Sequence, residues 1–97
     1  MFRHVVMFKW AEDVDTAHVE AVAAGLDALP AQIPCIQAYA HGPDARVNDG
    51  NYDYVVVGDF ASVDEYLEYR DHPAHQAFIT DLVVGRVVDR AAVQFES

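Results

Sequence analysis

Two histidines and a tyrosine lie close together in the second half of the chain, at Tyr69, His72 and His75. An imidazole titrates near neutral pH and takes or gives a proton, and a tyrosine hydroxyl donates a hydrogen bond to a carbonyl or an oxyanion. This set predicts removal of a proton from a carbon next to a carbonyl. His75 would be the general base, and Tyr69 would donate to the developing oxyanion.

Each of these side chains also has a structural interpretation. His75 falls on the apolar stripe of its helix, where a core histidine needs only one hydrogen bond to be satisfied. Tyr69 would then pack by its ring and keep its hydroxyl in water. His72 precedes Pro73, a position that favours capping of a new helix or a bond across the break.

The predicted strands add a histidine and a tyrosine to the candidate site. His4 in an apolar strand is unexpected, because burying an imidazole costs free energy unless it is hydrogen-bonded. If the strand phase is right, alternation places His4 and Tyr54 on the sheet face that the helices cover. Phe78 shares the helical stripe of His75. We therefore expect His4, Tyr54 and Phe78 to bind a small-molecule substrate in one cavity with apolar walls.

Motifs for other chemistries are absent. The sequence has no Gly-rich phosphate loop and no Ser placed as a nucleophile between glycines. His72 and His75 are three residues apart, with Pro73 between them and no carboxylate pair beside them, so we expect no metal site and no cofactor. Cys35 is the single cysteine. It is therefore interpreted as a small buried residue without an internal disulfide.

Charge and composition restrict the partners. The 97 residues include 16 acidic and 6 basic ones, a formal net charge of −10, and an acidic surface repels nucleic acid and anionic lipid. The apolar runs are too short to span a bilayer and no signal peptide follows Met1, so we expect a cytoplasmic protein. The hydrophobic share of 53% favours an apolar surface reserved for a partner.

Hydrophobic periodicity predicts one domain over residues 1–97, in the order strand–helix–strand–strand–helix–strand. A first helix is expected from Asp15 or Thr16 to Leu29, where Pro30 stops it. The strands are expected at residues 2–10, 35–41, 52–60 and 87–95.

The second helix is expected in two parts. Ser62 is a good N-cap, and Glu65 three residues later completes a capping box. This part reaches about Arg70. Pro73 suits the first turn of a restarted helix, and Gly85 is a plausible end.

The order of the elements predicts an α+β fold of the ferredoxin-like type. The short polar connection at residues 44–51 favours a hairpin between the second and third strands, and two βαβ-like halves joined this way leave both helices on one sheet face. The other face is then bare. Its apolar residues would pair with a second copy of the chain in a two-fold homodimer; they are Val5, Met7, Val55 and Val57.

The sequence resembles the stress-responsive α/β-barrel (Dabb) family over nearly its whole length. The first strand, Arg3-His4-Val5-Val6-Met7-Phe8-Lys9, is similar to the family's first strand with its histidine. Gly42 closes the second strand as in the family. The most specific similarity is carried by Phe60-Ala61-Ser62 with Glu65, followed by Tyr69 and His72-Pro73-Ala74-His75.

The resemblance implies a ferredoxin-like subunit paired into a homodimeric α/β barrel, with a pocket between sheet and helices. The family is functionally mixed. One branch, olivetolic acid cyclase, is a cofactor-free polyketide cyclase that closes a ring by aldol condensation. Its acid–base tyrosine and histidine match Tyr69 and His75, and its first-strand histidine matches His4. Tyr54 stands where that cyclase has another histidine.

Together these observations predict a small-molecule-binding homodimer, with cofactor-free acid–base chemistry of the cyclase or isomerase kind. The alternative is a non-enzymatic stress-response or structural dimer in which the same residues only stabilise the fold. A third interpretation, a haem-degrading monooxygenase, shares the barrel architecture, but a shared fold does not carry a function.

Overall fold

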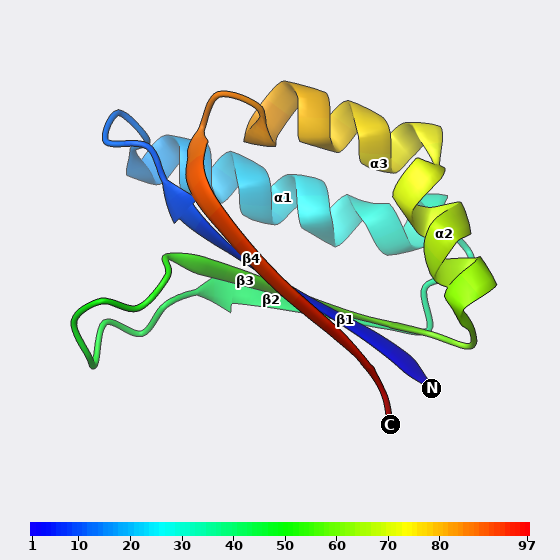
Figure 1. Ribbon diagram of the computed structural model, residues 1–97. Coiled ribbons are helices and arrows are strands. Elements are labelled where there is room, and N and C mark those ends of the chain that lie inside the picture. The colour runs from blue at the N-terminus through cyan, green and yellow to red at the C-terminus, as the bar shows by residue number, and fades with distance from the viewer.

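The computed structural model describes residues 1–97, and its elements follow one another in the predicted order (Figure 1). The chain forms four strands and three α-helices, and a π-helical turn, Ile79–Val83, follows the last helix. The strands are β1 (Phe2–Trp10), β2 (Ala38–Pro43), β3 (Tyr54–Phe60) and β4 (Val87–Glu96). The helices are α1 (Thr16–Gln32), α2 (Val63–Asp71) and α3 (Pro73–Phe78).

The sheet confirms the predicted ferredoxin-like fold. Its strand order is β2-β3-β1-β4, and every neighbouring pair is antiparallel. In Figure 1 the helices form a layer on one side of the sheet, and the other side carries none. The two termini lie together, since the Ser97 amide donates to the Met1 carbonyl over 2.9 Å.

Strict alternation divides β1 and β3 between the two faces. Along both strands, buried residues on the helix-covered side alternate with half-buried ones on the other side. The core between sheet and helices is mainly aliphatic and aromatic. Its most deeply buried members are Val22, Leu26, Leu29, Ile33, Tyr54, Val56 and Phe60.

The middle of the helix-free face is apolar, as predicted, and the Arg3–Asp59 ion pair lies toward one end of it. Val5 lies opposite Val57, and Met7 lies opposite Val55. β4 extends this surface with Val93 and Phe95, which are 65% and 46% exposed. We define the helix-free face as Val5, Met7, Ala40, Val55, Val57, Ala91, Val93 and Phe95.

The first helix is longer than predicted, because Pro30 lies inside it and does not end it. The proline removes one hydrogen bond from the last turn. The chain nevertheless continues helically to Gln32, and the Ile33 amide donates to the Leu29 carbonyl over 2.9 Å. Leu29 and Ile33 are 2% and 1% exposed. Their burial holds the last turn in place despite the missing bond.

The second and third strands both start later than predicted. Residues 33–36 form a turn that buries Cys35, so pairing of β2 begins only where Ala38 meets Asp59. Before β3, the Asp53 carboxylate accepts from the Trp10 amide over 2.7 Å and pairs with Arg46 over 2.8 Å. These bonds hold Asp53 outside the regular ladder.

The contact between α1 and α3 depends on a glycine. A Cβ atom at Gly25 would lie 2.9 Å from Phe78 Cδ1 and 3.0 Å from Leu82 Cδ1. We expect Gly25→Val to destabilise the protein by about 1–3 kcal/mol through overpacking. Urea unfolding measures this difference.

The matched control is Ala24→Val on the exposed side of the same helix. There the added carbons meet no neighbour, and only the lower helix propensity of valine, about 0.5 kcal/mol, applies. Equal losses in the two variants would contradict the close packing of α1 and α3.

Candidate acid–base site

A break between α2 and α3 positions the candidate base. His72 has an extended conformation, with φ −63° and ψ 137°, because the residue before a proline avoids the helical region. Its Nδ1 accepts from the Ala74 amide over 3.0 Å. His72 therefore caps α3, which confirms the structural interpretation. In an unbroken helix the Ala74 amide would donate to the Arg70 carbonyl, so the break frees that oxygen.

The freed carbonyl fixes the tautomer of His75. His75 Nδ1 lies 2.9 Å from the Arg70 oxygen, and a carbonyl only accepts, so Nδ1 carries a hydrogen. In the neutral ring Nε2 then has a free lone pair. Burial lowers the pKa of His75, although the Arg70 carbonyl and the charge of Asp71 act in the opposite direction. His75 is therefore a neutral base at neutral pH, with Nε2 as its basic atom.

His4 is held in the opposite tautomer. It is 5% exposed in the middle of β1, and the Gln94 side-chain amide nitrogen donates to its Nδ1 over 3.0 Å. The neutral ring therefore carries its hydrogen on Nε2. Burial lowers the pKa of His4 to about 4, with smaller contributions from the charges of Arg90 and His75. At neutral pH, His4 is a neutral hydrogen-bond donor.

Tyr69 provides a second donor. Its side chain is 3% exposed and its ring lies 4.4 Å from that of His75, measured between centroids. Burial raises the pKa of Tyr69 to about 12, and a hydrogen bond to Tyr39 partly offsets this. The two hydroxyl oxygens are 2.7 Å apart. Tyr69 therefore remains protonated at neutral pH.

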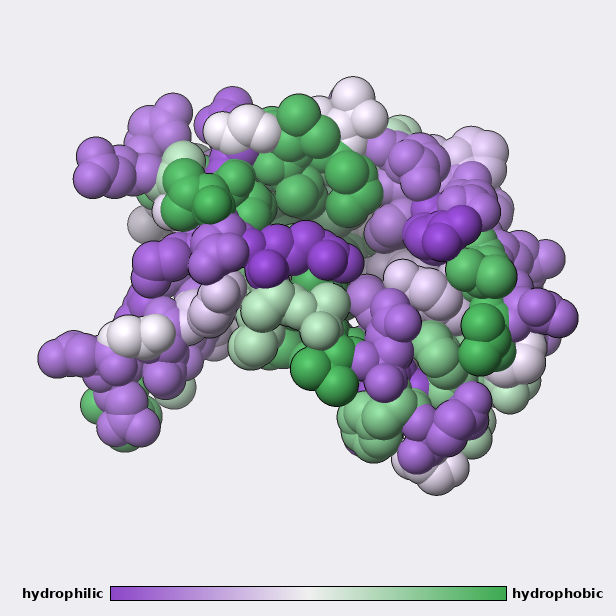
Figure 2. Space-filling model, viewed as in Figure 1, coloured by the Kyte–Doolittle hydropathy of each residue, from purple (hydrophilic) through white to green (hydrophobic).

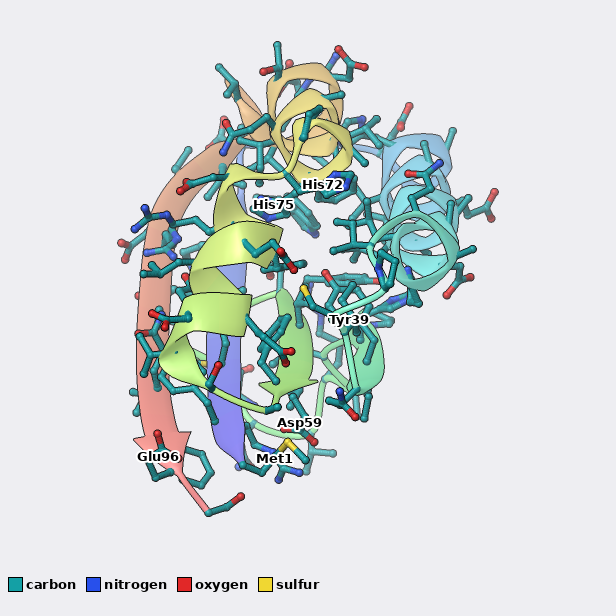
Figure 3. The ribbon with its side chains drawn as sticks, turned by 90° about the vertical axis from the view of Figure 1, so that its right-hand side faces the viewer. Met1, Tyr39, Asp59, His72, His75 and Glu96 are labelled. Carbon is teal, nitrogen blue, oxygen red and sulfur yellow. The ribbon has the colours of Figure 1, made fainter.

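The structure brings these three predicted residues together. Tyr66 lies between His4 and Tyr69, with ring centroids 4.9 Å and 6.1 Å away. Figure 3 shows His72 and His75 at the helix break and Tyr39 on the far side of the space between α2 and α1. We refer to His4, Tyr69 and His75 as the acid–base cluster.

The acid–base cluster has unused hydrogen-bonding capacity. Nε2 of His4 and Nε2 of His75 make no hydrogen bond within the protein. No fully buried side-chain nitrogen or oxygen lacks a partner, so both Nε2 atoms retain access to solvent. The donor Nε2 of His4 and the acceptor Nε2 of His75 thus remain available for a ligand, and the Tyr39–Tyr69 hydroxyl pair adds one proton beyond its shared bond.

Tyr54 belongs to a different group. In the pairing of β1 with β3, Tyr54 lies opposite Phe8, whereas His4 lies opposite Gly58. Four residues of strand, or about 13 Å, separate these positions. Tyr54 Oη lies 2.8 Å from His41 Nδ1, and His41 Nε2 lies 2.6 Å from the Asp27 carboxylate. In neutral His41, Nε2 donates to the carboxylate and Nδ1 accepts the Tyr54 proton.

Phe78 also lies outside the acid–base cluster, in the contact with Gly25. The predicted cavity between sheet and helices is not hollow in the structure. The one hollow, of about 380 Å³, opens on the helix-free side beside the 44–53 loop. Figure 2 shows a concave outline on that side. The hollow is lined by Met7, Asp44, Gly50, Asn51, Tyr52, Tyr54 and Val55.

Sequence reasoning missed several partners of these residues, of which Tyr39, His41 and Gln94 matter most. Tyr39 and His41 are two residues apart, so strand alternation places both on the helix-covered face. That spacing was a usable signal. No sequence signal indicated Gln94, because only the pairing of β4 with β1 places it opposite His4.

Cys35 is structural, as predicted. Its thiol is buried and donates to the Glu65 carbonyl over 3.3 Å. Burial raises the pKa of the thiol to about 11. A thiol that stays protonated is a poor nucleophile.

Comparison with known proteins places this fold among described relatives. The sequence profile of the Stress responsive A/B Barrel Domain family (Dabb) matches residues 2–97. A dimeric ferredoxin-like protein of unknown function from Thermobifida fusca YX is 40% identical, with a TM-score of 0.92; the match covers 99% of this chain and 90% of that one. No curated protein matches.

Two more distant structures share the fold alone. An Arabidopsis thaliana protein is 22% identical with a TM-score of 0.86, over 100% of this chain and 95% of that one. The hydroxynitrile lyase of Passiflora edulis is 14% identical with a TM-score of 0.84, over 97% of this chain and 90% of that one. None of the helices has the length and apolarity that crossing a membrane requires.

The buried His4 makes stability depend on pH. Its folded pKa of about 4 lies below the ordinary value of 6.5, so between these values the unfolded chain binds the proton more readily. The free energy of unfolding should therefore fall as the pH is lowered from 6.5 to 4, by about 1.4 kcal/mol per unit of pKa difference. We expect His4→Gln to lose this part of the dependence.

Urea unfolding at pH 7 and pH 4.5, at one protein concentration, measures both slopes. The acidic groups that titrate below pH 5 contribute equally to wild type and variant. Identical pH dependence in the two proteins would show that His4 is not held neutral by burial.

Proposed function

The chain belongs to the stress-responsive A/B barrel family, and we propose that it is a homodimeric small-molecule-binding enzyme that removes a proton next to a carbonyl. The observation that supports this most is the acid–base cluster, whose rings are linked by the contacts His4–Tyr66, Tyr66–Tyr69 and Tyr69–His75. Its unbonded acceptor is Nε2 of His75, its unbonded donor is Nε2 of His4, and the Tyr39–Tyr69 hydroxyl pair has one further proton to donate. A carbonyl substrate requires this combination for enolisation.

The proposed reaction begins with proton transfer to His75. Its Nε2 takes a proton from the carbon next to the carbonyl, and the electron pair of that C–H bond moves to the carbonyl oxygen. Tyr69 and His4 donate hydrogen bonds to the resulting enolate. Because these groups are fixed before the reaction, they stabilise the charge without reorganisation.

Two outcomes follow from the enolate. In an isomerisation, protonated His75 returns the proton to a different carbon. In an aldol-type cyclisation, the enolate carbon forms a bond to a second carbonyl carbon, and that carbonyl oxygen takes the proton. The second outcome corresponds to the polyketide cyclase that the sequence resembles. The lyase from Passiflora edulis shares only the fold and selects neither outcome.

Proton removal is testable without the natural substrate. Enzyme-catalysed exchange of hydrogen for deuterium next to the carbonyl of aromatic 1,3-diketones is followed by NMR in D2O. A positioned general base contributes about 10²–10⁴-fold. We therefore expect His75→Gln to lower the exchange rate by about that factor, and Tyr69→Phe to lower it as well. The wild-type exchange rate should rise with pH and then become constant, because His75 acts as a base only when its ring is neutral. The plateau should begin below pH 6.5, because burial lowers the pKa of His75.

His18→Gln is the matched control. His18 is also bonded to a backbone carbonyl, that of Leu82 over 2.8 Å, but it lies on α1 outside the acid–base cluster. Exchange that continues unchanged in His75→Gln would disprove the assigned base. The non-enzymatic alternative predicts that no carbonyl compound raises the melting temperature, whereas ligand binding raises it by mass action.

The proposed dimer pairs the helix-free faces of two copies. These faces are apolar and carry no helix, and the Thermobifida fusca relative is described as dimeric. A two-fold axis would set the same patch of each copy against the other. The hollow beside Met7 and Tyr52 then lies at the rim of the interface, where the partner covers it.

A single charge tests this interface. Val57→Glu places a carboxylate in the middle of the helix-free face twice in each dimer, and burying unpaired charge is strongly unfavourable. We expect this variant to sediment as a monomer at concentrations where the wild type sediments as a dimer. Ala21→Glu adds the same charge on the exposed side of α1 and should remain dimeric. A dimeric Val57→Glu variant would place the interface elsewhere.

A further inference from the structure

We infer that Tyr39 is a positioning residue for Tyr69. Its hydroxyl donates a hydrogen bond to the Tyr69 oxygen, so the Tyr69 hydroxyl can donate its own hydrogen bond to an enolate or phenolate oxygen of the ligand. This inference rests on the proposed function and adds to it a residue and a ligand class. Tyr39 lies on β2 and Tyr69 on α2. Their rings are 6.0 Å apart at 65°.

The backbone makes room for this contact. Tyr39 pairs with Gly58 across the β2–β3 ladder, and His4 pairs with the same glycine from β1. A Cβ atom at Gly58 would lie 3.3 Å from the Tyr39 ring. Without that atom, Tyr39 extends over β3 toward α2. Figure 3 labels Tyr39 at the sheet, below the helix break that carries His72 and His75.

Counting protons shows that one is left over. The two hydroxyls carry two protons, but they share a single hydrogen bond of 2.7 Å and neither has another partner in the protein. One phenolic proton therefore has no protein acceptor. By contrast, His41 accepts the proton of Tyr54. Among the tyrosine hydroxyls that make a hydrogen bond to another side chain, only the Tyr39–Tyr69 pair has a surplus proton.

The direction of the bond in the ligand-bound state follows from the proton count. When a ligand oxygen accepts the Tyr69 proton, only the Tyr39 proton is left for the shared bond, so Tyr69 then accepts from Tyr39. The pKa values agree with this direction, because the shared bond lowers the pKa of Tyr69 and raises that of Tyr39. A hydroxyl that accepts a hydrogen bond becomes a stronger donor in turn. Tyr39 therefore orients the Tyr69 proton and strengthens it toward an anionic oxygen.

The surroundings favour a flat ligand. Aromatic rings pack around Tyr69: the ring centroids of Phe60 and His75 lie 4.9 Å and 4.4 Å from that of Tyr69. The hydrogen-bond partner of the Tyr69 hydroxyl is the neutral hydroxyl of Tyr39, so the donors there are neutral. Neutral, preorganised donors among apolar rings suit delocalised oxyanions, of which phenolates and the enolates of 1,3-dicarbonyls are the simplest.

Nitrophenols of graded acidity provide the test, because their absorbance distinguishes bound phenol from bound phenolate. The full-length wild type should bind the phenolate in preference to the phenol. Tyr39→Phe keeps the ring over Gly58 and should reduce this preference about fivefold, the usual worth of one hydrogen bond. Tyr69→Phe should abolish it. Tyr52→Phe is the control, because it removes a hydroxyl bonded to exposed Asp89.

The outcomes separate the two proposals. If Tyr39→Phe weakens phenol and phenolate equally, or changes neither, while Tyr69→Phe abolishes the preference, the role of Tyr39 is overturned and the proposed function stands. If the wild type binds neither form, both fall. A reduced preference at unchanged melting temperature supports the inference, because loss of packing alone would not distinguish the two forms of the ligand.

Discussion

The site depends on the loss of one helical hydrogen bond at the boundary between α2 and α3. His72 precedes Pro73 and has a non-helical backbone conformation, and its ring Nδ1 accepts a hydrogen bond from the Ala74 amide. The Arg70 carbonyl is left without its usual donor, and His75 Nδ1 and Gln76 Nε2 occupy it over 2.9 Å and 2.7 Å. A backbone defect thereby determines which nitrogen of His75 is basic. A continuous helix would leave that ring without an orienting acceptor.

The sheet gives its two faces different tasks. The helix-covered face holds polar groups among apolar ones, each with at least one partner, so burial tunes their pKa values without leaving an unsatisfied atom. The helix-free face is apolar in its middle, has charged residues such as Arg3 and Lys9 toward its ends, and is available for a second copy of the chain. Successive side chains along β1 and β3 point to opposite faces of the sheet. His4 therefore faces the helices, whereas its neighbours Arg3 and Val5 lie on the helix-free side.

Buried tyrosines in this fold differ in what their protons do. The Tyr54 proton is accepted by His41, which Asp27 holds in place. That chain of bonds ties α1 to β2 and β3, and it suits a structural role better than ligand binding. The Tyr39–Tyr69 pair makes one bond from two donors. In our proposal, the proton that this pair does not use internally is the one that Tyr69 donates to a ligand.

The sequence by itself determined the element order, the two sheet faces, the Ser62 cap and the break at Pro73. These features rest on local rules: alternation, capping and the backbone restriction at proline. It also predicted His4, Tyr69 and His75 as site residues, because polar residues on apolar stripes are unusual. The predicted helix end at Pro30 was wrong. The end of the helix depends on the burial of Leu29 and Ile33, and no local sequence pattern indicates that burial.

Only the tertiary structure decided which polar residues meet. His4 and Tyr54 lie on the same face of the sheet, but the strand register sets them four residues apart. Alternation in the sequence predicts which face a residue is on. It does not predict which residue of the neighbouring strand lies opposite. The tautomers of His4 and His75 depend on Gln94 and on a backbone carbonyl, both positioned by the fold. Tyr39 meets Tyr69 across 30 residues of chain. Contacts between distant segments require the three-dimensional pairing of strands and helices, because a sequence orders residues along the chain alone.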